Sequence, residues 1–164
     1  MLLRTTLIAA AAAALFGGAA MADTHTHTDT AADAAVQQIV EGYTAAWKRA
    51  DPQAIAANFT EDGDLINPDG FHASGHAAIA GFYAHAFAMG YAGSDGDFAI
   101  KLARRIAPRV VLIDGEWSIS HARSPDGAPR PEERGILAGV LVETSQGWRL
   151  AALREQSSAS KIGP

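Results

Sequence analysis

Helical and strand patterns do not alternate along this chain, and their order is the strongest constraint on its fold. Apolar residues recur at three- and four-residue steps in Asp33–Ala50, which predicts an amphipathic helix. A short helix is predicted after Asp51-Pro52, because aspartate caps helices and proline suits their first position. A third is predicted over His76–Met89, and strand patterns fill Phe98–Gln156. Helices followed by a run of strands predict an α+β domain with an antiparallel sheet.

Two turn signals lie inside the expected strands. Pro68-Asp69-Gly70 predicts a tight turn between a short strand at 65–67 and a return strand that begins at Phe71. Asp114-Gly115 lies between apolar residues. That dipeptide is compatible with a two-residue hairpin, and also with one long strand that carries a glycine bulge.

The sheet is expected to curve round the first helix as a cone, whose open mouth is a natural pocket. The stretch Ile136–Val142 is apolar on both faces of its predicted strand, apart from Gly139. One face is expected to meet the helices. A second copy of the chain is the simplest cover for the other face, so a homodimer through the sheet is expected.

Residues 1–22 have the pattern of a secretory signal peptide. Arg4 supplies the positive charge, Leu7–Phe16 is an apolar core, and Ala20-Met21-Ala22 fits a signal-peptidase site. We expect a flexible leader over 23–32, one domain over 33–157 and a tail over 158–164. The mature protein is therefore expected in the periplasm or the medium of a bacterium, without a membrane anchor after cleavage.

Charge and composition exclude several classes of function. The formal net charge is −5, no basic run is present, and the chain has no cysteine. An acidic chain of this kind is a poor ligand for nucleic acids and for anionic lipids. No glycine-rich nucleotide loop accompanies the strands, so no cofactor is evident.

Several short motifs resemble the nuclear transport factor 2-like superfamily, which includes SnoaL-like proteins, and most closely its SgcJ/EcaC family. They are, in order, Trp47, Asp51, Phe59 with Asp62, Asn67-Pro68-Asp69-Gly70, Gly75 with Ile79, His85, Tyr91-Ala92-Gly93-Ser94 and Gly147-Trp148-Arg149-Leu150-Ala151-Ala152. The resemblance implies a conical α+β fold and one long strand through Asp114-Gly115. It also implies a small-molecule pocket, or an enzyme of the isomerase, cyclase or oxidoreductase type.

Ketosteroid isomerases belong to that superfamily, and the comparison implies only part of their site here. Their oxygen-binding tyrosine falls on Tyr43, their catalytic aspartate on Asn67, and their second donor near Gly139. An amide takes no proton at neutral pH, so the base of that reaction is missing.

The remaining candidates are polar or aromatic residues expected near the mouth. His85 is the candidate catalytic base, because its ordinary pKa is near neutral, with His121 as a possible partner. Candidate ligand-binding residues are Tyr43, Trp47, Asn67, Phe71, Phe82, Trp117, His121 and Arg154. Arg154 is expected to share a face with Leu150 and Ala152. Each has a structural alternative: core packing for the aromatic residues, a turn for Asn67 and a surface ion pair for Arg154.

The expected function is therefore the binding of a small, largely apolar molecule. An enzyme with His85 as base and a dimeric assembly module are the alternatives. A separate expectation depends on cleavage after Ala22, which would leave Asp23-Thr24-His25 at the N-terminus. An amine, two amides and the His25 imidazole form a square-planar nitrogen set, which suits Cu(II) or Ni(II).

Overall fold

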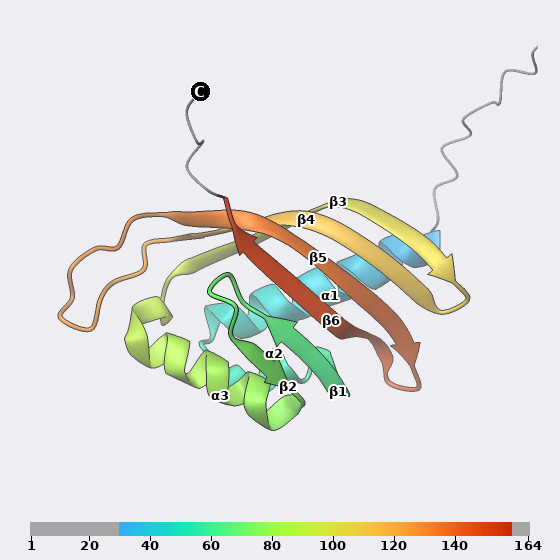
Figure 1. The fold of residues 1–164 in the computed structure, drawn as a ribbon, viewed down its shortest axis with the longest axis horizontal. Helices are drawn as coiled ribbons and strands as arrows, with labels where there is room; N and C mark the ends of the chain where they lie inside the picture. Colours follow the sequence, from blue (N-terminus) through green and yellow to red (C-terminus); the bar gives the residue numbers. More distant parts are fainter. Residues whose placement is uncertain (1–29, 159–164) are drawn as a thin grey trace, which may run out of the picture.

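The computed structural model describes residues 30–158, which form three α-helices, a π-helical turn and six strands (Figure 1). The elements are α1 (Thr30–Lys48), α2 (Pro52–Ala56), β1 (Phe59–Ile66), β2 (His72–Ser74), α3 (His76–Ala86), η1 (Phe87–Tyr91), β3 (Asp95–Ala107), β4 (Val110–Ser120), β5 (Glu133–Thr144) and β6 (Gly147–Ser157). No helix in this part of the chain is long and apolar enough to cross a membrane.

One curved sheet with the strand order β2-β1-β6-β5-β4-β3 carries the helices on one side (Figure 1). The predicted α+β class is confirmed. Neighbouring strands are antiparallel except β1 and β6, which are parallel. The expectation of an antiparallel sheet is wrong at that one pairing, because β1, which follows α1 and α2, enters the sheet beside the last strand and runs in the same direction.

Strand β1 is longer than its sequence pattern suggests. It begins at Phe59, whereas the apolar pattern predicted a strand only from Leu65. The buried Phe59 therefore belongs to the sheet and not to the short helix α2. The polar segment Thr60–Asp64 gives no strand periodicity. Its register with β6 shifts between Phe59 and Asp64. Pairing with β6 therefore overrides weak local propensity here.

Asp114-Gly115 lies inside one long strand, β4, as the family resemblance implied. Gly115 pairs with Ile100 and Asp114 with Leu102, so Lys101 is the extra residue. The bulge is thus on β3 and not at the glycine itself. A Cβ on Gly115 would lie 2.6 Å from the carbonyl oxygen of Ala99, which explains glycine at this close approach.

A second bulge sets which residues of β6 face the helices. Val140 pairs with Ala152 but Leu141 pairs with Leu150, so Ala151 is the unpaired residue. Because the side chains of a strand alternate, one extra residue exchanges the two faces beyond it. Leu150 and Leu153 are both buried, and Glu155 continues the inward face.

The core lies between the sheet and the helices. Helix α1 contributes Ile39, Tyr43 and Trp47, each at most 5% exposed, and α3 contributes Ile79 and Tyr83. Helix α3 then passes into η1, where Gly90 has a φ of 110°. The carbonyl of Gly90 accepts a hydrogen bond from the amide of Arg123 at 3.0 Å, which fixes η1 to the connection between β4 and β5.

Gly90 generates a stability prediction. An added Cβ would overlap the carbonyl oxygen of Arg123, and the positive φ is itself strained for alanine. We expect Gly90→Ala to lower the free energy of unfolding by about 3 kcal/mol. Gly81→Ala is the matched control, because Gly81 lies in α3 with nothing within 4 Å of the added atom. It should raise that energy by up to about 1 kcal/mol. Urea unfolding of both variants measures this, and equal stabilities would contradict it.

Candidate functional site

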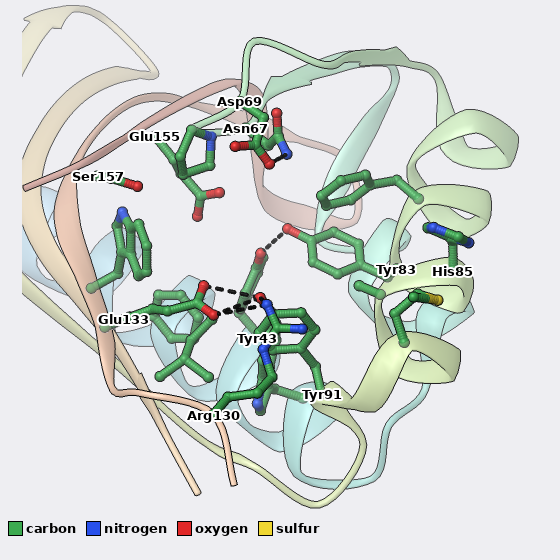
Figure 2. A pocket seen from close by; sticks show the side chains of 18 residues that line it. Tyr43, Asn67, Asp69, Tyr83, His85, Tyr91, Arg130, Glu133, Glu155 and Ser157 are labelled. Atoms are coloured by element: carbon green, nitrogen blue, oxygen red, sulfur yellow. Dashed lines mark hydrogen bonds and ion pairs between the residues drawn. The ribbon is translucent and has the colours of Figure 1, made fainter. Parts of the chain in front are cut away.

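A cavity of about 320 Å³ opens between the inner face of the sheet and helices α1 and α3 (Figure 2). Its lining is largely aromatic, with a few polar groups. The lining residues are Tyr43, Trp47, Asn67, Pro68, Asp69, Phe82, Tyr83, His85, Ala86, Met89, Tyr91, Phe98, Trp117, Ile119, Arg130, Glu133, Glu155 and Ser157. Cavities of this size and character are typical of small-molecule sites.

Two tyrosines meet in the depth of the cavity. Tyr43 of α1 and Tyr83 of α3 join their hydroxyl groups in a hydrogen bond, and either hydroxyl can be the donor. The rings pack edge to face, and Phe98 packs edge-on against Tyr43 with centroids 4.7 Å apart. Both side chains are almost completely buried, and burial raises the pKa of each phenol well above its ordinary value. The pair, hereafter the deep pair, stays protonated and leaves one O–H to donate into the cavity.

Glu155 reaches the same chamber from β6. Figure 2 shows its carboxylate pointing into the cavity on the side of the two phenol oxygens. No hydrogen bond or ion pair of this carboxylate occurs within residues 30–158. Its negative charge contributes to the raised pKa of both Tyr43 and Tyr83. Burial raises the pKa of Glu155 from 4.5 to about 7.

This arrangement gives the cavity two complementary chemical abilities. A carboxyl group with a pKa of about 7 can take or give a proton at neutral pH. A buried phenol can donate a hydrogen bond to an oxygen on which charge develops. The structure thus offers a base, Glu155, and an oxygen-binding donor, the deep pair, in one largely apolar chamber.

A second polar group, hereafter the mouth cluster, consists of Tyr91, Arg130 and Glu133. The Tyr91 hydroxyl donates to Glu133 at 2.8 Å and accepts from Arg130 Nη2 at 2.8 Å. Arg130 Nη2 also contacts Glu133 Oε1 at 3.2 Å, and its guanidinium lies 4.7 Å from the centroid of the Tyr91 ring. Burial, followed by the bond to Glu133, raises the pKa of Tyr91 to about 12.

Six of the sequence-predicted residues line the cavity: Tyr43, Trp47, Asn67, Phe82, His85 and Trp117. Asn67 serves the turn, since its Oδ1 accepts from the amide of Phe71 at 2.7 Å. Trp47 Nε1 donates to Ser94 and Trp117 Nε1 to the carbonyl of Ile136, each at 3.2 Å. His85 is exposed at the rim, and no hydrogen bond or ion pair of its ring occurs in the described part of the chain.

Three predicted ligand-binding residues lie outside the lining. Phe71 is 52% exposed and stacks on Phe82, with ring centroids 5.5 Å apart. His121 is exposed and pairs with Asp95 at 2.8 Å, not with His85. Arg154 pairs with Asp64 at 2.7 Å on the other face of the sheet from Glu155, because the Ala151 bulge reverses the expected alternation. The predicted metal ligand, His25, lies outside the described residues.

Several lining residues were missed by sequence reasoning. Tyr83 belongs to the apolar stripe of the helix predicted over His76–Met89, and a tyrosine in such a stripe is typical of core packing. Glu155 was not among the predicted site residues, because the bulge at Ala151 that turns it inward leaves no local signal in the sequence. Arg130 lies in a proline-rich connection with no periodicity, so no local signal indicated it.

The position of Glu155 predicts a pH dependence of stability. Its pKa is higher in the folded chain than in the unfolded chain, so ionisation disfavours the folded state. Relative to Glu155→Gln, the wild type should keep its full stability below about pH 4.5. It should then lose about 3 kcal/mol as the pH rises through about 7.

Denaturant unfolding of the wild type and of Glu155→Gln measures the difference in their stability. The useful range is roughly pH 4 to 8, where the ionisation of this carboxyl changes. Glu61→Gln, which removes an exposed carboxyl from β1, is the matched control and should parallel the wild type. Parallel curves for the wild type and Glu155→Gln would contradict the buried position of the Glu155 carboxyl.

The architecture of this chain is similar to that of several solved structures. Solved structures with similar folds include three bacterial proteins at low sequence identity. A Caulobacter vibrioides protein with a cystatin-like fold is 24% identical, with a TM-score of 0.68 over 79% of this chain and 91% of that one. A ketosteroid isomerase-like protein from Erwinia carotovora atroseptica is 20% identical, with a TM-score of 0.65 over 80% and 96%. A candidate scytalone dehydratase from Novosphingobium aromaticivorans is 16% identical, with a TM-score of 0.66 over 77% and 83%.

No curated protein sequence has significant similarity to the chain. The family model for the SnoaL-like domain, in contrast, matches residues 40–136. That span runs from the middle of α1 into β5 and includes the deep pair and the mouth cluster. The chain therefore belongs to the SnoaL-like domain family.

Proposed function

We propose that this protein binds a small, largely apolar carbonyl compound in its cavity and moves a proton within it, with Glu155 as the base. One observation carries the proposal: an unpaired carboxyl with a pKa of about 7 faces a hydrogen-bonded phenol pair in an aromatic chamber. The apolar wall favours a ring or alkyl body. The deep pair favours a carbonyl oxygen at one end of that body.

The proposed step needs only these groups. Glu155 takes a proton from the carbon next to the carbonyl, and the electron pair of that C–H bond moves onto the carbonyl oxygen. The free O–H of the deep pair donates to the enolate oxygen that forms, which lowers the energy of that intermediate. Glu155 then returns the proton to the same or another carbon, so the net reaction is an exchange or an isomerisation without an external cofactor.

Glu155 replaces His85 as the proposed base because of where its carboxyl lies. A base must lie within hydrogen-bond reach of the proton that it removes, and the cavity is where the ligand is held. The Glu155 carboxyl points into that cavity, whereas the His85 ring is exposed at the rim. The ketosteroid isomerase-like protein and the candidate scytalone dehydratase give further support. An isomerase and a dehydratase both remove a proton from carbon.

Binding without turnover is a second candidate function. One observation favours it: Asn67 stands where the family resemblance puts a catalytic aspartate, and its amide is held by the turn at Phe71. In that case Tyr43, Tyr83 and Glu155 would only orient the ligand. The narrower SgcJ/EcaC assignment is compatible with either function.

A turnover assay separates these two functions. β,γ-Unsaturated ketones with small ring bodies are suitable probes, because their isomerisation gives a conjugated product that absorbs in the ultraviolet. We expect the wild type to accelerate this reaction and Glu155→Gln to lose about 10²- to 10⁴-fold of the rate. The double variant Tyr43→Phe with Tyr83→Phe should lose about 10²-fold, since it removes both phenol donors to the developing oxyanion.

His85→Gln is the matched control, because it changes a titratable group at the rim of the same cavity. It should keep the wild-type rate. Full activity of Glu155→Gln would contradict Glu155 as the base. Tight binding of the ketones without turnover by the wild type would favour the second candidate function.

Export, dimerisation and the N-terminal metal site are further proposals. We propose that the mature chain begins at Asp23 and pairs through the outer face of the sheet. The exposed Leu102 and Ile136 on that face support this pairing. A native mass spectrum of the exported protein tests all three. We expect a dimer without residues 1–22 that takes one Cu(II) per chain, and no Cu(II) with His25→Gln. A retained N-terminus, a monomer or copper binding by that variant would each contradict the corresponding proposal.

A further inference from the structure

The polar side chains of the cavity form two groups at different depths. Tyr43 and Tyr83 of the deep pair are 4% and 3% exposed. In the mouth cluster the side chains of Arg130 and Glu133 are 32% and 36% exposed. No hydrogen bond joins the two groups within residues 30–158, and Figure 2 shows them as separate networks. A ligand that fills the cavity therefore meets polar groups at two depths.

Arg130 keeps hydrogen-bond donors that the protein does not use. A guanidinium carries five N–H groups. The contacts of Arg130 with Tyr91 and Glu133 both involve Nη2. No partner of Nε or Nη1 occurs in the described part of the chain. Because the guanidinium is fixed over the Tyr91 ring and lines the cavity, these donors are already positioned for a ligand acceptor.

The charges around Arg130 indicate what kind of acceptor fits. Glu133 already balances the positive charge of Arg130. Among the described residues, the other carboxyl groups of the lining belong to Asp69 and Glu155, and the lining includes no second lysine or arginine. A carboxylate or phosphate on the ligand would enter a region of excess negative charge. An uncharged carbonyl or hydroxyl oxygen accepts the same hydrogen bond without that repulsion.

We propose that Arg130 is a specificity-determining residue, which binds an uncharged oxygen at the end of the ligand opposite the deep pair. The substrate class is thus a neutral, ring-bodied molecule with two oxygen functions, one at each end. This inference rests on the proposed function, since it assumes that the first carbonyl lies at Tyr43 and Tyr83. To the proposed function the inference adds a second oxygen on the ligand and the absence of a charge on it. Arg130 is the residue that selects for both features.

Matched pairs of aromatic ketones test this inference by calorimetric titration. Each pair has one diacetyl compound and one in which an isopropyl group of the same shape replaces the second acetyl group. Benzene, naphthalene and biphenyl bodies cover different lengths. With at least one body, the wild type should bind the diacetyl compound about tenfold more tightly, as expected for a hydrogen bond to a charged donor. The corresponding acetyl carboxylate should bind more weakly than the diacetyl compound.

Arg130→Met should remove this preference, and Arg134→Met should keep it. Arg134 is the matched control, because it lies four residues further along the chain and pairs with Glu132 on the surface at 2.7 Å. Arg130→Lys is a second variant, which keeps the charge beside Glu133 but lacks the planar fork, so it should lose most of the preference. The measured quantity is the ratio of two affinities in one variant, which a loss of stability alone does not change.

The possible failures of this inference and of the proposed function are distinguishable. An equal affinity within every pair, or an unchanged preference in Arg130→Met, would overturn the inference while binding of the first carbonyl still supported the proposed function. Tighter binding of the carboxylates would overturn the neutral charge of the ligand. Failure of the wild type to bind any of the compounds would contradict both the inference and the proposed function.

Discussion

The site depends on the single extra residue in β6. Without the bulge at Ala151, the side chains of Arg154 and Glu155 would exchange faces, and an arginine would enter the aromatic chamber. With the bulge, Arg154 pairs with Asp64 outside, and Glu155 faces the cavity without an ion pair in the described chain. An unpaired carboxyl is costly in such surroundings, which is why its pKa is raised to about 7. The site therefore gains a neutral-range acid at the expense of stability.

The helices complete what the sheet begins. Tyr43 belongs to α1 and Tyr83 to α3, so their hydrogen bond forms only when both helices pack on the sheet. Gly90 lets η1 approach the connection after β4, and that connection carries Arg130 to Tyr91. The deep pair and the mouth cluster thus use different parts of one architecture. A base on the sheet, donors on the helices and a guanidinium on a loop surround one cavity.

Sequence reasoning predicted the elements better than the site. The stripe of α1 and the turn at Pro68-Asp69-Gly70 follow from local spacing, so they were predicted and placed Tyr43, Trp47 and Asn67 in the lining. Arg154 was predicted on the face of Leu150 and Glu155 was overlooked, because a bulge depends on the register between two strands and leaves no local signal. Strand β1 was shortened for a similar reason: its polar half is held by β6 and not by its own propensity.

The central claim is that Glu155 is an unpaired carboxyl inside the cavity with a pKa in the neutral range. Carbon-13 NMR of the side-chain carboxyl groups, with Glu155→Gln to assign its signal, tests this most directly. We predict that the Glu155 signal titrates with a midpoint near pH 7. A midpoint near 4.5, the value of an ordinary glutamate, would show that water reaches the carboxyl freely. It would contradict the water-excluded position from which the role of Glu155 is argued.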